Sequence, residues 1–227
     1  MEQLQLGKPA VHTTYYGRNV DQMPKLLASG KEPMSIAHLM EQRIAVRERG
    51  IPQVQHDAWW NNYFDTADLW LRHPDKGGKV VPYDAQVLNF LREHVKPDER
   101  LVDGAVPLPN GLFEAMEGLD LTPADIERLN SRGYAPREAK NSGVWKELAR
   151  TQERLDTYVD AVAPRAGGDQ NMMNLCFGKA SEVPTGRLWY IDYWYNDSLA
   201  NGSNNLTNAY GRLVGVAPKL HAGKLRT

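Results

Sequence analysis

The chain is almost free of cysteine: Cys176 is the only one among its 227 residues, so no disulfide can form within it. Proteins without disulfides are typical of reducing compartments. Long apolar runs are also absent, since no stretch reaches the roughly 20 apolar residues that a membrane-spanning helix needs. The amino terminus lacks the basic start and apolar run of a secretory signal. We therefore expect a cytoplasmic protein that has no membrane segment.

An excess of charge of one sign is absent as well. The 27 Lys and Arg residues face 28 Asp and Glu residues, which gives a formal net charge of −1. Nucleic-acid affinity depends largely on basic charge, so this balance disfavours a nucleic-acid partner. Arg43, Arg47 and Arg49 are interleaved with Glu41 and Glu48, a pattern that indicates a solvated helix face.

Motifs of known reactions are missing too. The chain has no dinucleotide fingerprint Gly-x-Gly-x-x-Gly, no phosphate-binding loop and no Gly-x-Ser-x-Gly elbow. His38 and Glu41 have a spacing that can bind a metal on a helix, but two ligands do not make a site. We therefore expect no metal and no cofactor. The remaining enzyme candidates are an adjacent acid–base pair and a small acidic cluster: His56 with Asp57, and Glu114, Glu117 and Asp120.

Helix signals are present throughout the first three quarters of the chain. Thr122-Pro-Ala-Asp125 combines an N-cap residue, a proline at the first helical position and an acid at the third. Asp84 is a second N-cap, and Pro97 stops the helix that follows it. Apolar spacing and capping together predict helices at about residues 36–49, 85–96, 112–116, 123–132 and 144–162.

Strand signals are fewer. The turn-like composition of residues 73–79 separates two short extended runs, 68–71 and 79–82, and predicts a hairpin. After the glycine pair that ends at residue 168, the pattern changes to strands and loops. We therefore expect an α+β protein: a helix-rich body of four to five helices in residues 1–167, and a small antiparallel β segment in residues 168–227. The segment is expected to pack on the body as one domain.

Aromatic residues are concentrated in the stretch 188–195. Strict alternation places Trp189, Ile191, Tyr193 and Tyr195 on one strand face and Leu188, Tyr190, Asp192 and Trp194 on the other. Because both faces are aromatic, either both are covered by protein, as in a central strand, or one is a contact surface. Rings beside amide side chains suit ligand binding, and five asparagines follow this strand: Asn196, Asn201, Asn204, Asn205 and Asn208.

The chain closes this region with the strand-like run Arg212-Leu-Val-Gly-Val-Ala217. An aromatic strand, a polar Asn/Ser/Thr stretch and a final strand of this kind resemble the end of C-type-lectin-like modules. Those modules include the ligand-binding variable proteins of diversity-generating retroelements. The resemblance covers residues 187–217 and rests on composition, and the upstream landmarks of the fold are missing from the sequence. It favours a binding role.

A second aromatic concentration lies in residues 57–70. Trp59, Trp60 and Tyr63 could form a stacking platform, with Asn61, Asn62, Asp65 and Asp68 as polar contacts. The alternative, which we favour, makes the rings anchors of the core while Asn and Asp side chains satisfy backbone groups.

These patterns lead to two hypotheses. The first is a non-enzymatic binding or structural-interaction protein with a protein or carbohydrate partner, in which self-association through the same surface is compatible. Its expected contact residues are Trp189, Tyr193, Trp194, Tyr195, Asn196, Asn205, Tyr210 and Arg212, with Trp59, Trp60, Asn61, Asn62 and Tyr63 as secondary candidates. The alternative is a cofactor-independent hydrolase with a site between residues 56–68 and the C-terminal strands, where His56 and Asp57 would act.

Overall fold

The computed structural model describes residues 4, 6, 11–48, 50–167, 172–192 and 198–218. Its helices are α1 (Asn19–Ala28), α2 (Ile36–Glu48), α3 (Gln53–Trp60), α4 (Ala85–His94), α5 (Leu112–Ala115), α6 (Pro123–Leu129), α7 (Pro136–Lys140), α8 (Gly143–Ala149) and α9 (Gln152–Val162). Its strands are β1 (His12–Tyr16), β2 (Glu32–Pro33), β3 (Phe64–His73), β4 (Gly77–Val81), β5 (Val106–Pro107), β6 (Leu119–Leu121), β7 (Leu175–Cys176), β8 (Thr185–Ile191), β9 (Ala200–Asn201) and β10 (Arg212–Val216).

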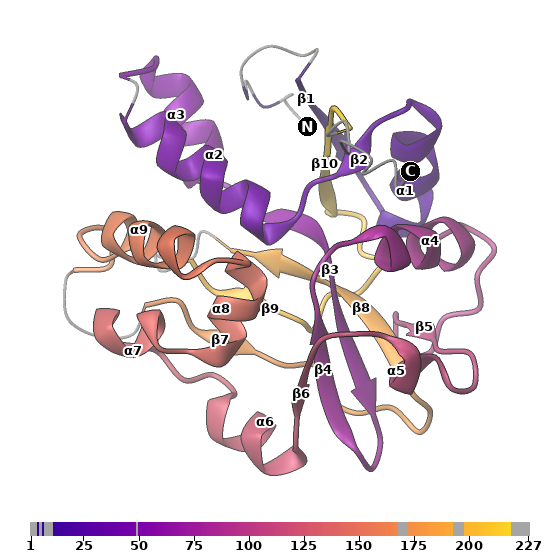
Figure 1. Ribbon diagram of the computed structural model, residues 1–227. Coiled ribbons are helices and arrows are strands. Elements are labelled where there is room, and N and C mark those ends of the chain that lie inside the picture. The colour runs from indigo at the N-terminus through magenta and orange to yellow at the C-terminus, as the bar shows by residue number, and fades with distance from the viewer. Residues whose placement is uncertain are drawn as a thin grey trace, which may run out of the picture.

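All ten of these strands belong to one mixed sheet with the central order β1-β10-β3-β8-β9-β7. β2 adds to β10, β5 to β8, and β4 to β3, while β6 extends the sheet from β4. β10 runs parallel to β3 and antiparallel to β1, so the two ends of the described chain meet in neighbouring strands. Figure 1 shows the sheet between two groups of helices, with α1, α4 and α5 on one side and α2, α3 and α6 to α9 on the other.

The two faces of the sheet bury separate hydrophobic clusters. On β8, Leu188 packs with α1 and α4, whereas Trp189 and Ile191 pack with α2, α3, α8 and α9. β10 alternates in the same way, with Leu213 on one face and Val214 on the other. Successive strand residues point to opposite faces, so a sheet covered on both sides favours apolar residues on both faces. Of the two alternatives for the aromatic strand, the covered central strand is therefore the correct one for Leu188, Trp189 and Ile191, whereas Tyr190 is half-buried.

The expected helix-rich body with a small β segment at the end is wrong. Both halves of the chain contribute strands to the sheet, and the long central strand β3 lies well before residue 168. Several strands have only two or three residues, too few to show any periodicity. The first part of β3, residues 64–67, was not predicted as a strand because it follows α3 directly, within a segment that the sequence analysis interpreted as one aromatic unit. The boundary at residues 167 and 168 lies at the edge of the described residues and stays a prediction.

Predictions made from short sequence signals were more accurate than the prediction of the overall architecture. The predicted hairpin is confirmed, with Leu69 opposite Val81 and His73 opposite Gly77. Both capping predictions hold, since the Asp84 side chain accepts from the backbone N–H of Val87 and Thr122 forms a capping box. The single helix expected over residues 144–162 is wrong: Arg150 adopts a left-handed conformation, φ 69°, which divides it into α8 and α9.

Arg43 also corrects an expectation, because it is buried and not solvated. Its Nε donates to the backbone O of Trp59 at 3.0 Å, and its Nη2 donates to the backbone O of Asn62 at 3.0 Å. Its Nη1 donates to the hydroxyls of Tyr158 and Ser198 at 2.8 and 3.2 Å. One guanidinium thus joins α2 to α3, α9 and the segment before β9.

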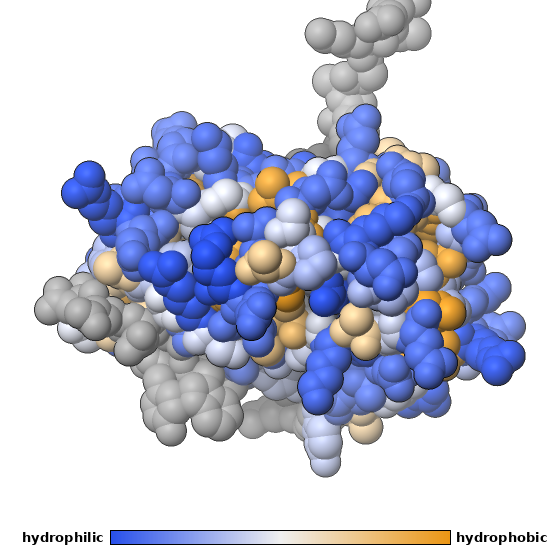
Figure 2. All heavy atoms as spheres, turned by 90° about the horizontal axis from the view of Figure 1, so that it is seen from below, coloured by the Kyte–Doolittle hydropathy of each residue, from blue (hydrophilic) through white to orange (hydrophobic). Residues whose placement is uncertain are grey.

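The face around α6 and the tip of the β3–β4 hairpin is mostly hydrophilic, with small separate hydrophobic areas (Figure 2). Within the described ranges, no helix combines the length and the apolar character that crossing a membrane requires.

Candidate functional site

Three strand ends meet at one edge of the sheet. Because β3 and β10 are parallel and β8 is antiparallel to β3, the starts of β3 and β10 and the end of β8 lie side by side. Asp65 is opposite Tyr190 on β8 and Leu213 on β10. The register of β3 and β8 shifts just beyond this point, between Asp65 and Leu69, and such irregularities redirect side chains at sheet edges.

A hollow of about 360 Å³ opens at this edge. We call it the tyrosine hollow, after the three tyrosines that line it together with carboxylates, amides and small residues: Tyr63, Asp65, Tyr190, Asp192, Ser203, Asn204, Asn205, Asn208, Tyr210 and Gly211. Its size is within the range of ligand sites in proteins, roughly 300–1,000 Å³. Segments far apart in sequence thus form one concave surface.

Asp65 forms the buried base of the tyrosine hollow. Its Oδ1 accepts from the side chain of Asn204 at 2.7 Å, and its Oδ2 accepts from the backbone N–H of Arg212 at 2.6 Å. Burial raises the pKa of this carboxyl to about 6, against the opposing effect of hydrogen bonds from Arg212, Asn19 and Asn204. The carboxylate therefore links β3 to the loop before β10 and to α1.

The asparagine-rich loop between β9 and β10 is held mainly by its own side chains. The amide oxygen of Asn201 accepts from the backbone N–H of Ser203, that of Asn205 from Thr207, and that of Asn208 from Tyr210. Such local bonds are a known reason for asparagine in turns. The loop is also anchored to the body, because Arg187 donates to the backbone O of Asn204 and buried Leu206 donates to Gly104. Many of the asparagines that suggested ligand contacts thus shape the loop.

The side chains that this loop presents to solvent are few. Tyr210 is 69% exposed, the most exposed of the large hydrophobic residues described. Ser203, Asn205 and Asn208 are also exposed. The hydroxyl of Tyr63 donates to the backbone O of Tyr210 and joins the start of β3 to the tip of the loop. The outer rim of the hollow therefore consists of exposed side chains on a backbone that side-chain hydrogen bonds hold in place.

Three tryptophans that were candidates for ligand contact lie in the core. Trp189 has no exposed surface, and its Nε1 donates to the backbone O of Leu69 at 3.0 Å, which corrects its assignment to a contact surface. Trp59 and Trp60 are buried as well, as the favoured structural interpretation of their segment predicts. Aromatic rings of central strands and neighbouring helices fill the interior here, so ring content alone did not distinguish core from surface.

The other contact candidates divide into four groups. Tyr63, Asn205 and Tyr210 line the hollow. Arg212 and Asn62 adjoin it: the guanidinium of Arg212 donates to the side chain of Asn62 and packs 4.5 Å from the ring centre of Tyr63. Asn61 instead donates to Asp57 on α3. Four candidates lie outside the described residues: Tyr193, Trp194, Tyr195 and Asn196.

The candidate enzyme residues lie in different parts of the fold. His56 Nδ1 is 3.5 Å from Asp57 Oδ1, but the His56 ring stacks on Trp60 and its Nε2 is 3.1 Å from an Arg165 nitrogen. Glu114 pairs with Lys76, and Asp120 pairs with Lys79 at 3.5 Å. Figure 1 shows α3 and α5 on opposite sides of the sheet, so the two groups form no common site.

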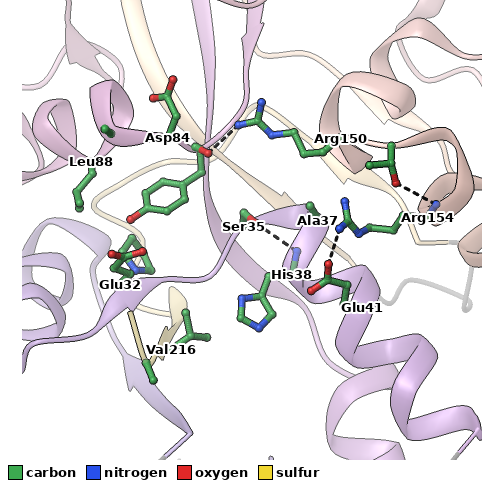
Figure 3. A pocket seen from close by; sticks show the side chains of 15 residues that line it. Glu32, Ser35, Ala37, His38, Glu41, Asp84, Leu88, Arg150, Arg154 and Val216 are labelled. Atoms are coloured by element: carbon green, nitrogen blue, oxygen red, sulfur yellow. Dashed lines mark hydrogen bonds and ion pairs between the residues drawn. The ribbon is translucent and has the colours of Figure 1, made fainter. Parts of the chain in front are cut away.

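A larger hollow, of about 620 Å³, lies between the starts of α2, α4 and α9 (Figure 3). Four of its charged side chains bind other groups of the chain. Arg154 pairs with Glu41, Arg150 donates to the backbone O of Tyr83 at 2.7 Å, and Asp84 caps α4. This helix hollow is the larger of the two, but the exposed ring of Tyr210 and the exposed amides of Asn205 and Asn208 lie at the tyrosine hollow.

The sequence named Asp65 as a polar contact of the second aromatic segment, but it did not select Tyr190 or Asp192 as contact residues. These three residues come together only because β3 pairs with β8, which no local pattern predicts. Asn204 and Asn208 lie in the stretch that drew attention, but residue type alone did not separate them from their neighbours. Within the described residues, no three His, Cys, Asp or Glu side chains gather in a way that could hold a metal ion.

The buried carboxyl of Asp65 leads to a prediction about pH. Its pKa is raised from 3.8 to about 6, so its contribution to stability is fully present below the unfolded value and is lost as pH rises through the folded value. The unfolding free energy of the wild type, relative to Asp65→Asn, should fall by about 2 kcal/mol between pH 4 and pH 7. Urea unfolding of both proteins measures it, and a difference that does not change with pH would contradict it.

Comparisons with known proteins support the fold. No family model matches the chain, and no curated protein matches it either. Among solved structures it is similar to one described as "Accommodation of massive sequence variation in Nanoarchaeota by the C-type lectin fold", with a TM-score of 0.64 and 17% identity. The match covers 90% of this chain and 97% of the other. The chain therefore has the C-type lectin fold, which agrees with the resemblance of residues 187–217 and extends it to most of the sequence.

Proposed function

We propose that this chain is a non-enzymatic binding protein that contacts a protein partner through the rim of the tyrosine hollow. The observation that carries the proposal is the exposed Tyr210, surrounded by Ser203, Asn205 and Asn208, on a loop whose backbone is fixed from within. Tyr, Ser, Gly and Asn are the residues that antibody contact loops use most, since tyrosine supplies rigid area and the small polar residues supply adaptable hydrogen bonds.

The construction of the loop also suits a surface whose side chains can be exchanged. The neighbouring solved structure is described as a C-type lectin fold that accommodates massive sequence variation. In this chain the loop is anchored by Arg187 and by buried Leu206, which do not belong to the exposed rim. The exposed side chain of Tyr210 can therefore be exchanged without disturbing the packed core, whereas Asn205 and Asn208 also hold the loop backbone. We propose that the rim determines which partner is bound.

Tyr210→Ala tests the proposal. Binders are first selected from displayed peptide and small-protein libraries against the immobilised chain, and a glycan array is probed in parallel. Because a well-packed aromatic anchor dominates many interfaces, the variant should weaken most independent binders by at least about tenfold. Its unfolding free energy should stay within about 0.5 kcal/mol of the wild type, since the side chain is exposed.

Val183→Ala is the matched control. Val183 is also exposed, at 40%, and it precedes β8 at the end of the strand far from Tyr190. This change should leave all binders unaffected. If the selected binders tolerate Tyr210→Ala as well as Val183→Ala, the proposed surface is refuted. Glycan binding without protein binders would replace the protein partner by a carbohydrate. Self-association through this surface stays a prediction, and a monomer in light scattering at high concentration would remove it.

A further inference from the structure

The two chain segments that form most of the tyrosine hollow contain no basic residue. Residues 57–71 and 188–211 have no Lys, Arg or His, although the chain has 27 Lys and Arg and six His in total. Both segments contain aspartates: Asp57, Asp65 and Asp68 in the first, Asp192 and Asp197 in the second. These two segments are therefore rich in aromatic residues, amides and acids and free of basic residues, in a chain whose formal net charge is −1.

The structure brings two of these carboxyl groups into the hollow itself. Asp65 and Asp192 line it together with the rings of Tyr63, Tyr190 and Tyr210. The pKa of Tyr190 is raised to about 12, chiefly by burial and then by Asp192, and Asp65 adds to the effect. Burial is also the main cause that raises the pKa of Tyr63; Arg212 acts in the opposite direction, and Asp65 and Asp192 add to the rise. Both negative charges thus act on the rings that form the walls.

The positive charge nearest to these rings is that of Arg212, which acts to lower the pKa of Tyr63 and of Asp65. The guanidinium of Arg212 packs between two rings, with its carbon 4.5 Å from the ring centre of Tyr63 and 5.2 Å from that of Tyr16. It also donates to Asn62, and it is not among the residues that line the hollow. This contact demonstrates that the Tyr63 ring accepts a cation on a face.

We infer that the tyrosine hollow accepts a cationic side chain, lysine or arginine, from the protein partner. The electron-rich faces of tyrosine rings attract cations, and the attraction grows when the pair is partly withdrawn from water. Two carboxylates in the same concave site add Coulomb attraction, which is stronger there than in bulk water. An anionic group would be repelled by both carboxylates, and a neutral group could gain hydrogen bonds from them but no Coulomb attraction. The inference rests on the proposed function and specifies its partner.

A titration with small probes tests the inference without a known partner. Nα-acetyl-lysine methylamide carries the cation, and Nα-acetyl-norleucine methylamide has a matching carbon chain without it. NMR should show saturable binding of the lysine probe, with shifts at Tyr63, Tyr190 and Tyr210, and binding of the norleucine probe at least about tenfold weaker. Added salt should weaken only the lysine probe.

Asp192→Asn removes one charge while preserving shape. It should lower the affinity for the lysine probe by about tenfold and leave the norleucine probe unchanged. Asp98→Asn, at an exposed aspartate after α4, is the control and should change neither. Equal affinity for both probes, no binding of the lysine probe, or an Asp192→Asn effect no larger than the control would each overturn the inference. Partner binding that still depends on Tyr210 in those cases would leave the proposed function standing.

Discussion

Trp189→Ala is expected to lower the free energy of unfolding by about 4 kcal/mol, because it empties a large volume at the centre of the sheet. The ring is fully buried and contacts Trp70 and Phe177, with ring centres 5.7 and 5.8 Å away. The change also leaves the backbone O of Leu69 without the indole donor. A buried acceptor without its partner adds to the loss.

Urea unfolding of the wild type, Trp189→Ala and Trp189→Phe measures this effect. Phenylalanine retains most of the apolar contact and loses the N–H donor, so its cost should lie between those of the other two. A loss below about 0.5 kcal/mol for Trp189→Ala is what an exposed side chain would give. That outcome would indicate that Trp189 lies on the surface and would contradict its position in the core.

Arg43→Ala should have a loss of similar size, about 4 kcal/mol, since it removes one guanidinium from several buried acceptors. Those acceptors belong to Trp59, Asn62, Tyr158 and Ser198, which lie on separate elements. Arg43→Lys should still lose about 2 kcal/mol, because a single ammonium cannot reproduce the planar fork of donors.

Arg47→Ala is the matched control for this prediction. Arg47 lies one helical turn further along α2, is exposed, and donates to the backbone O of Asp160 at 3.1 Å. Its loss should stay within about 0.5 kcal/mol. Thermal or urea unfolding of the three variants measures these losses. An Arg43→Ala protein as stable as Arg47→Ala would show that the buried hydrogen-bond network contributes little to the free energy of unfolding.

The sequence was sufficient for local structure. The Asp84 and Thr122 caps, the β3–β4 hairpin and the strand-and-loop character after residue 172 depend on residues that are close in sequence. These features could therefore be predicted from side-chain hydrogen bonds to neighbouring backbone groups and from turn composition. The C-terminal resemblance to C-type-lectin-like modules also pointed to the fold.

The sequence was not sufficient for what depends on distant partners. Arg43 has the composition of a solvated helix face, and only its surroundings from α3 and α9 make it buried. Trp189 and Tyr210 are both aromatic residues of the same region, yet one fills the core and the other is exposed. Trp189 is the buried one because helices cover both faces of β8. The tyrosine hollow exists because β3 pairs with β8 and β10, and this pairing joins residues more than 100 positions apart.

Amide hydrogen exchange of the chain with and without a selected protein binder tests most directly where the partner sits. Binding at the tyrosine hollow predicts slower exchange concentrated in residues 61–65, 188–192 and 199–212, and little change elsewhere. Protection confined to residues 32–41, 83–88 and 150–154, around the helix hollow, would contradict it.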